Sequence, residues 1–218
     1  MSRKKNLAPS RAKKRPYHRK QRRQRFLLYC EGEVTEPNYF KDLARFLRSS
    51  LIEVEIADEQ RKDPKKLVEL AKARRDSAQR DARRASDDSL RYDEVWCVFD
   101  GDEHARLKAA VDQATAISID LAVSNPCFEI WVLIHFQDQF SFISCDSANA
   151  GVKKHIPDYA KHVDFSKIEG KACEAIKRAR KMEAIVRKNG KWFDNPSTSV
   201  WRLVTKLCEE GKIPITRV

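Results

Sequence analysis

Apolar runs alternate with amphipathic segments along the first 136 residues. Residues 25–30, 93–99 and 119–124 are typical of buried strands, and residues 51–57 alternate apolar and acidic positions like a half-exposed strand. Helical spacing follows Pro37 and also covers 63–85, 103–117 and 127–136, with Asp63 expected to cap the second of these helices. This repeated strand–helix order predicts an α/β fold, a parallel sheet flanked by helices.

The remainder of the chain shows weaker patterns. Residues 137–168 predict irregular structure, and two helices are expected near 169–188 and 197–210, with Ser197 and Thr198 capping the second. The predicted organisation is therefore a disordered basic arm (1–24), an α/β domain (25–136) and a helical C-terminal extension packed on that domain (137–218).

Charge is distributed unevenly along the 218 residues. The formal net charge is +12, and 12 of the 44 Lys and Arg residues fall within residues 1–25, which contain no Asp or Glu, so the other 32 balance the 32 acidic residues. A basic arm of this kind suits a polyphosphate partner, which predicts nucleic-acid binding. A solubilising tail, or one that meets acidic partners without specificity, is the alternative. The residues expected to contact phosphates are Arg15, Arg19, Lys20, Arg22, Arg23 and Arg25.

The composition also indicates the cell compartment and the state of the cysteines. No apolar stretch is long enough to span a membrane, and the N-terminus lacks the apolar core of a signal peptide, so we expect a cytoplasmic protein without membrane contact. The six cysteines are scattered without a C-x-x-C pair, which favours buried reduced thiols over disulfides or a zinc site.

Two acidic clusters follow apolar runs that are predicted to be strands. Glu31 and Glu36 follow residues 26–30, and Asp100 and Asp102 follow residues 95–99. Ligands of open parallel sheets bind at the carboxyl ends of the strands, and crowded carboxylates there are costly unless they hold a hard cation such as Mg²⁺ or Mn²⁺. The pattern indicates a divalent-metal site, although a polar Asp-Gly-Asp turn is the plainer alternative.

Four motifs together resemble the RloB-like family, which is related to the TOPRIM-fold, OLD-type nucleases. They are LYCEGEVTEPNYF at 28–40, VFDGD at 98–102, SNPCFEIWVLIHF at 124–136 and NPSTSV at 195–200. The resemblance implies a TOPRIM-like parallel sheet and a metal-dependent nuclease, encoded beside an ABC-type ATPase partner in anti-phage or restriction-linked loci.

The resemblance also implies roles for particular residues. Glu31, Asp100 and Asp102 match the catalytic, metal-binding carboxylates of the family. Glu36 matches a second glutamate, with a spacing one residue longer than in the OLD-like pattern, and Glu129 stands where a later acidic residue would help a second metal ion. The alternative for Glu129 is a buried carboxylate that is hydrogen-bonded to the loop around Asn125.

The predicted function is therefore a two-metal endonuclease that hydrolyses phosphodiester bonds, with RNA as one possible substrate. The alternative is a non-catalytic subunit that binds nucleic acid or docks onto the ATPase. No basic catalytic residue can be matched, and Lys153, Lys154 and Lys171 are candidates by charge alone. His135 is predicted to be a core or capping histidine.

Overall fold

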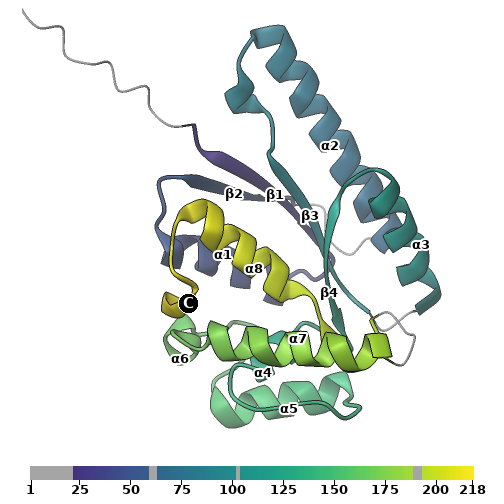
Figure 1. Cartoon of the computed structure of the whole chain (residues 1–218), viewed down its shortest axis with the longest axis vertical. Coiled ribbons are helices and arrows are strands. Elements are labelled where there is room, and N and C mark those ends of the chain that lie inside the picture. The colour runs from purple at the N-terminus through teal and green to yellow at the C-terminus, as the bar shows by residue number, and fades with distance from the viewer. Residues whose placement is uncertain (1–21, 59–62, 102–103, 189–192) are drawn as a thin grey trace, which may run out of the picture.

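A five-stranded sheet forms the centre of the computed structural model, which describes residues 22–58, 63–101, 104–188 and 193–218 (Figure 1). The strand order is β2-β1-β3-β4-β5; the first four strands run parallel, and β5 pairs antiparallel with β4. The strands are β1 (Gln24–Cys30), β2 (Ile52–Ile56), β3 (Glu94–Asp100), β4 (Asp120–Asn125) and β5 (Ser197–Thr198).

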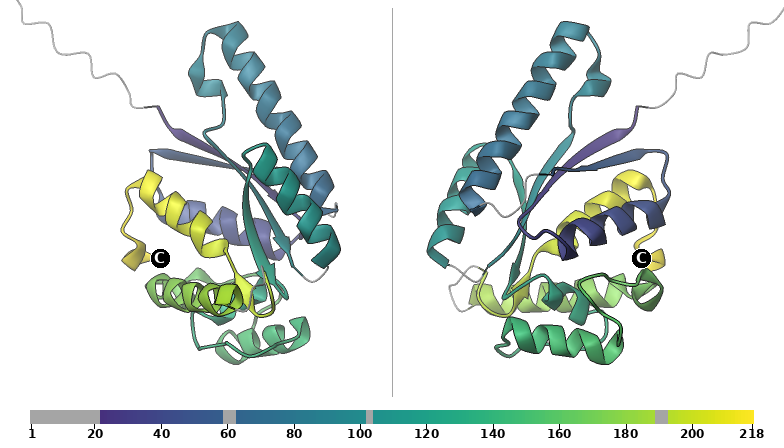
Figure 2. Two further views of the ribbon diagram at one scale, coloured as in Figure 1. Left: turned by 45° about the vertical axis from the view of Figure 1, so that its right-hand side comes forward. Right: turned by 180° about the vertical axis from the view of Figure 1, so that it is seen from behind.

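Helices cover both faces of this sheet, and Figure 2 shows α2 and α3 on the face opposite α1 and α8. On one face lie α2 (Pro64–Ala85) and α3 (His104–Ala116). The other helices are α1 (Thr35–Leu47), α4 (Glu129–Leu133), α5 (Cys145–His155), α6 (Phe165–Ile168), α7 (Ala172–Lys188) and α8 (Val200–Gly211), and single turns occur at Asp88–Leu90 and Ile215–Arg217. The predicted α/β fold class is therefore confirmed.

Strand alternation divides the core into two apolar clusters, one on each face of the sheet. In β1, Phe26 and Leu28 belong to the cluster under α1 and α8, whereas Leu27 and Tyr29 belong to the cluster under α2 and α3. All four side chains are almost fully buried. Burial on both faces explains why this segment is a continuous apolar run rather than an alternating one.

Two predicted helix starts can be compared directly with the structure. The Asp63 side chain accepts a hydrogen bond from the Lys65 N–H, which confirms the predicted cap of α2. The predicted cap of α8 is confirmed for Thr198 alone: α8 begins at Val200, whose N–H donates to Thr198 Oγ1 at 3.3 Å, although Ser197 and Thr198 themselves form β5. In β5, Ser197 pairs with Asn125 of β4 and Thr198 pairs with Ser124.

The predicted irregular segment 137–168 contains two helices, α5 and α6, so that prediction is wrong. The sequence of α5 is rich in Ser, Asp, Asn and Gly, and only Ala148 and Val152 on it are buried. Tertiary packing outweighs this low helix propensity, because a Cβ on Gly151 would lie 2.9 Å from Leu133 in α4. The apolar helix expected over 127–136 is likewise shorter, since α4 ends at Leu133 and continues only as turns.

None of the helices in the described part of the chain is both long enough and apolar enough to cross a membrane. The six cysteines are free; four are buried, while Cys145 and Cys173 are half-buried.

Candidate carboxylate site

The carboxyl ends of β1 and β3 bring Glu31 and Asp100 together. The Glu31 N–H donates to the Val98 carbonyl (2.9 Å), which continues the ladder one residue past β1. The Asp100 N–H donates to Glu31 Oε2 at 3.2 Å, and both residues are half-buried. Two of the three predicted catalytic carboxylates therefore share the mouth of the sheet, while Asp102 lies outside the described residues.

Gly101 lets the end of β3 approach β4 closely. Its N–H donates to the Ser124 carbonyl at 2.7 Å, and a Cβ at position 101 would lie only 3.0 Å from the Asn125 Cβ. Asn125 is itself buried and donates from Nδ2 to the Phe193 carbonyl at 2.6 Å. Its side chain therefore ties the C-terminal segment to the strand end beside Asp100.

Glu36 lies buried in the first turn of α1, only 5 % exposed. Its carboxylate lies against Gly32, where any Cβ would overlap it, and it accepts backbone N–H groups from Gly32 and from Glu36 itself. Burial raises the pKa of Glu36, and the charge of Glu129 raises it further, against the effect of the backbone donors. An acidic side chain in this position gains stability from any cation that binds nearby.

Glu129 begins α4 and is 2 % exposed. Its Oε1 accepts hydrogen bonds from Tyr159 Oη (2.9 Å), Lys161 Nζ (2.9 Å) and Thr35 Oγ1 (3.4 Å). Burial alone would raise the pKa of Glu129, but the bonds from Lys161 and Cys127 outweigh it and hold the pKa below its ordinary value. Glu129 is thus a charged, hydrogen-bonded buried carboxylate, and most of its donors come from segments other than the Asn125 loop.

Lys161 is the basic residue of this site that sequence reasoning missed. It lies between α5 and α6 with a left-handed backbone (φ 66°), and its side chain is half exposed while its Nζ contacts Glu129. Burial lowers the pKa of Lys161, but Glu129 and, more weakly, Asp100 outweigh this and raise the pKa above its ordinary value. No periodicity or motif marks position 161, which is 32 residues from its partner.

The lysines proposed by charge alone as basic catalytic residues have contacts outside the carboxylate site. Lys171 Nζ lies over the Phe136 ring, 4.5 Å from its centroid, and also donates to the Lys167 carbonyl. Lys153 and Lys154 are exposed in the last turn of α5. His135 is a core residue as predicted: it is 3 % exposed, Nδ1 pairs with the Trp131 carbonyl at 2.8 Å, and burial lowers its pKa to about 4.

The donor set of the site is made of carboxylate oxygens, which suit Mg²⁺ or Mn²⁺ better than softer metals. Glu31 lies beside Asp100, and Glu36 interacts electrostatically with Glu129. Within the ranges that the structure describes, which exclude Asp102, no three His, Cys, Asp or Glu side chains are grouped closely enough to hold a metal ion.

The arginines predicted to bind nucleic acid lie at the opposite end of the sheet, where β1 begins. Arg22 pairs with Asp93 (3.0 Å), and Arg25 pairs with Glu53 (3.2 Å) and Glu55 (3.3 Å). Arg23 is exposed. The other predicted contacts, Arg15, Arg19 and Lys20, lie outside the described residues.

The fold and this site define an α/β protein with a carboxylate cluster at the carboxyl edge of a mostly parallel sheet. A family model described as RloB-like protein matches residues 26–207, and the chain belongs to this family. No curated protein and no solved structure matches the chain.

Proposed function

We propose that this protein is a metal-dependent nuclease that hydrolyses phosphodiester bonds at the carboxyl edge of its sheet. The observation that carries the proposal is the hydrogen bond from the Asp100 N–H to the Glu31 carboxylate, which brings together two acidic residues from separate strands. A divalent cation shared by their side chains would account for acidic residues at a ligand-binding edge. Asp102 and Glu36 would complete the ligand set, and Glu129 would support it electrostatically.

When two Mg²⁺ or Mn²⁺ ions are bound, they would activate a water molecule and stabilise the leaving oxygen of the phosphodiester. The side chains of this chain contribute position and charge. Lys161 holds Glu129 ionised through a 2.9 Å ion pair, and because its side chain is half exposed, its ammonium group could also meet a phosphate oxygen. Glu31 is positioned by the Asp100 N–H, which orients its carboxylate toward the strand ends.

The rest of the proposal concerns partners. The basic residues at the beginning of the chain would attract the nucleic acid electrostatically and add no chemistry of their own. The family resemblance adds an ABC-type ATPase that controls the nuclease in anti-phage or restriction-linked defence. Either DNA or RNA fits this description, because carboxylate-held metal ions act on the phosphodiester that both share.

A non-catalytic subunit that docks onto the ATPase or binds nucleic acid is the second candidate. Two observations favour it: Lys161, the cation of the site, is already paired with Glu129, and the described residues group no three metal-binding side chains. Such a subunit would retain the sheet and the buried Glu129 network for stability alone.

Cleavage assays separate the two candidates. The purified protein is incubated with tRNA, single-stranded DNA and plasmid, with Mg²⁺ or Mn²⁺ or a chelator, and with and without the proposed ABC-type ATPase partner. Asp100→Asn tests the site, and Asp112→Asn, an exposed carboxylate paired only with Lys108 on α3, is the matched control. Metal-dependent cleavage that is lost only in Asp100→Asn supports the nuclease, whereas no cleavage with the ATPase present supports the docking subunit.

A further inference from the structure

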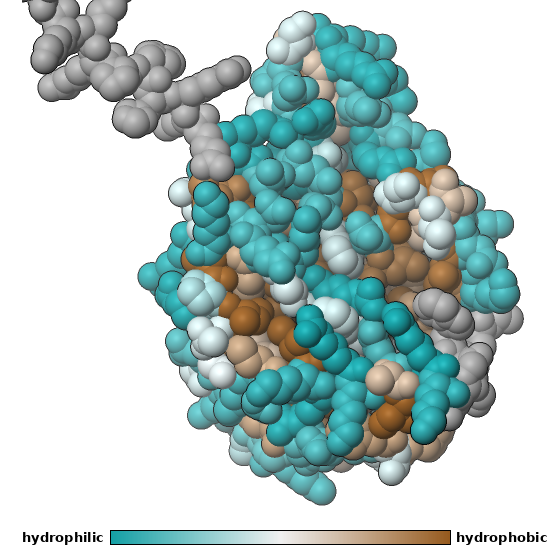
Figure 3. All heavy atoms as spheres, viewed as in Figure 1, coloured by the Kyte–Doolittle hydropathy of each residue, from teal (hydrophilic) through white to brown (hydrophobic). Residues whose placement is uncertain are grey.

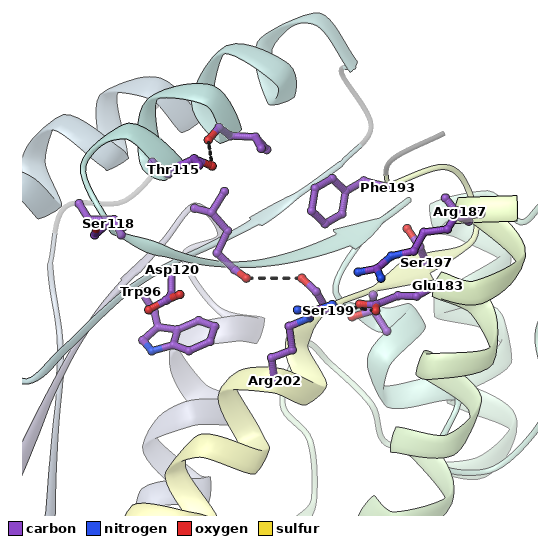
Figure 4. A pocket seen from close by; sticks show the side chains of 16 residues that line it. Trp96, Thr115, Ser118, Asp120, Glu183, Arg187, Phe193, Ser197, Ser199 and Arg202 are labelled. Atoms are coloured by element: carbon purple, nitrogen blue, oxygen red, sulfur yellow. Dashed lines mark hydrogen bonds and ion pairs between the residues drawn. The ribbon is translucent and has the colours of Figure 1, made fainter. Parts of the chain in front are cut away.

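A cavity lies against the outer edge of β4 (Figure 4). Its volume is 470 Å³, which is within the range of specific binding sites. Residues of α3, including Val111 and Thr115, line one side, and Glu183 of α7 and Arg202 of α8 line the other. None of the carboxylates discussed above contributes to it.

The edge of β4 that faces this cavity is only partly paired. The Val123 N–H donates to Ser199 Oγ (2.9 Å), and the Val123 carbonyl accepts from the Ser199 N–H (2.8 Å). The chain then turns into α8, so the antiparallel pairing of β5 with β4 covers only Ser124 and Asn125. Figure 4 shows Ser199 at this point, between the strand and the cavity.

Strand alternation places the backbone of Leu121 on the same open side as that of Val123. The Ser199 hydroxyl reaches the Leu121 carbonyl at 3.5 Å, the limit of a hydrogen bond. In the described part of the chain, no backbone carbonyl on this side pairs with the Leu121 N–H. Leu121 and Asp120 both line the cavity, so the unpaired part of the β4 edge faces the cavity.

Apolar side chains line the cavity on both faces of the sheet, together with the charged Asp120, Glu183, Arg187 and Arg202. Trp96 lines it from the face covered by α8, whereas Val111, Ala114 and Phe193 line it from the face covered by α3. Hydrophobic residues gather on this side of the molecule, over α3 and beside the C-terminal helices (Figure 3). An extended peptide sends alternate side chains to opposite sides, which is the arrangement these two walls would accommodate.

We propose that this edge is a docking site for an extended segment of another protein, which adds to β4 as a strand. The segment would be about five residues long, the length of an ordinary strand, with apolar side chains facing Trp96 and Val111. Its backbone would supply the carbonyl that the Leu121 N–H lacks. This inference does not depend on the proposed nuclease activity.

Other occupants match the cavity less well. A small apolar molecule would fill the walls but leave the Leu121 N–H without an acceptor. Residues 1–21 of this chain carry nine Lys and Arg residues but only Met1, Leu7 and Tyr17 as large apolar side chains, so they match such walls poorly. A second copy that paired edge to edge would bring the exposed Asp120 of each copy close to its counterpart, which like-charge repulsion disfavours.

The test begins with displayed random peptides of about nine residues, long enough to contain one strand. They are selected on the wild-type protein and counter-selected on Thr115→Trp, which places a large ring in the cavity from an exposed position on α3. Ala116→Trp is the matched control, because Ala116 is the next residue, is exposed and does not line the cavity. Circular dichroism melts establish that both variants are folded.

We expect the enriched peptides to alternate apolar and polar residues. Their affinity for Thr115→Trp should be at least about tenfold lower than for wild type or Ala116→Trp, because one or two strand hydrogen bonds and their packing are lost. Bound peptide should slow hydrogen exchange at the Leu121 amide. N-methylation of the peptide at alternate residues, in the phase that faces β4, should abolish binding, whereas methylation in the other phase should not.

Three results would overturn the proposal. The first is that no enriched peptide distinguishes wild type from Thr115→Trp. The second is that peptides methylated in either phase bind equally and hydrogen exchange at Leu121 is unchanged, which would indicate a site for side chains or small apolar molecules. The third is that the protein alone forms a dimer that Thr115→Trp dissociates, which would make a second copy the occupant. A nuclease assay on the same variants is independent of all three, so either proposal can fail without the other.

Discussion

The two ends of the central sheet carry charge in opposite ways. Where β1 begins, cations and anions meet in pairs: Arg25 bonds to Glu53 and Glu55 and stacks over Tyr92 at 4.5 Å. Where β1 ends, acidic residues gather, and one of them, Glu129, forms an ion pair with Lys161. At the first end the described charges form ion pairs within the fold, whereas at the second the charge of Glu129 makes ionisation of the buried Glu36 less favourable.

This difference separates charges that serve the fold from charges that serve a site. Burial and like charge raise the pKa of Glu36 at the carboxyl end, which means that the ionised form is costly there. Side chains kept in such an unfavourable state are typical of binding and catalytic sites. At the amino end, Tyr92 donates to Glu55 at 2.6 Å and Arg74 joins the same carboxylate at 3.0 Å, as expected of a structural network.

The largest expected effect comes from Asp100. If the carboxyl end holds catalytic metal ions, Asp100→Asn should lower metal-dependent phosphodiester cleavage by at least about a hundredfold, as loss of a key electrostatic group does in other active sites. The melting temperature without metal should change little, because Asp100 lies half-buried at the end of β3 rather than in the core. Loss of activity accompanied by global unfolding would instead place Asp100 among the structural charges.

Lys161→Met tests how far the carboxyl end depends on the ion pair between Lys161 and Glu129. Glu129 would remain almost fully buried without its ion-pair partner, so the free energy of unfolding at pH 7 should fall by about 2 kcal/mol, discounted because Lys161 is half exposed. Denaturant unfolding measures this. Because Lys161 lowers the pKa of Glu129, the loss should shrink as pH falls through the pKa of Glu129 and the carboxylate becomes neutral. A pH-independent loss would assign the effect to packing.

Arg25→Gln tests the amino end. We expect a loss of about 1 kcal/mol in the free energy of unfolding, since Arg25 joins two carboxylates but its partners are a third to nearly half exposed. Arg23→Gln is the control, because Arg23 is exposed, and it should leave stability unchanged. Weaker nucleic-acid binding by Arg25→Gln at unchanged stability would show that this arginine contacts phosphate after all.

The smallest expected effect is a gain of stability from Glu36→Gln. The pKa of Glu36 is raised in the folded state, so that state binds the proton more tightly than the unfolded chain, and stability falls as pH rises from the unfolded pKa through the folded one. The variant should therefore be more stable than wild type at pH 7, by up to about 1 kcal/mol, and lose this advantage below the unfolded pKa. Thermal melts without metal at several pH values measure it. An advantage that persists at low pH would contradict a charge effect.

Much of the fold could be predicted because its signals are local. Apolar runs such as 26–30 and 95–99 become the buried strands β1 and β3, and the acidic residues Glu31 and Asp100 come into contact because those strands are neighbours. Elements defined by tertiary contact could not be predicted in this way. The two residues of β5 form a strand only because Ser124 and Asn125 lie opposite them, and α5 depends on packing against Leu133.

The residues of the candidate site also differ in how well the sequence predicts them. Glu31 and Asp100 stand at recognisable strand ends, whereas Lys161 lies in a turn without periodicity and reaches Glu129 only through the fold. Arg25 appears in the sequence as part of a basic arm, yet β1 carries it to Glu53 and Glu55 of the neighbouring strand. Charge composition therefore indicates the kind of partner a chain attracts, but not which cations remain available to it.

Manganese binding to the metal-free protein tests the central claim most directly. Isothermal titration of wild type, Asp100→Asn and the control Asp112→Asn with Mn²⁺ at pH 7 should show saturable binding to wild type and control, and at least about tenfold weaker binding to Asp100→Asn, the loss expected when a metal site is impaired. Equal Mn²⁺ affinity in all three proteins, or none in any of them, would contradict a cation shared by Glu31 and Asp100.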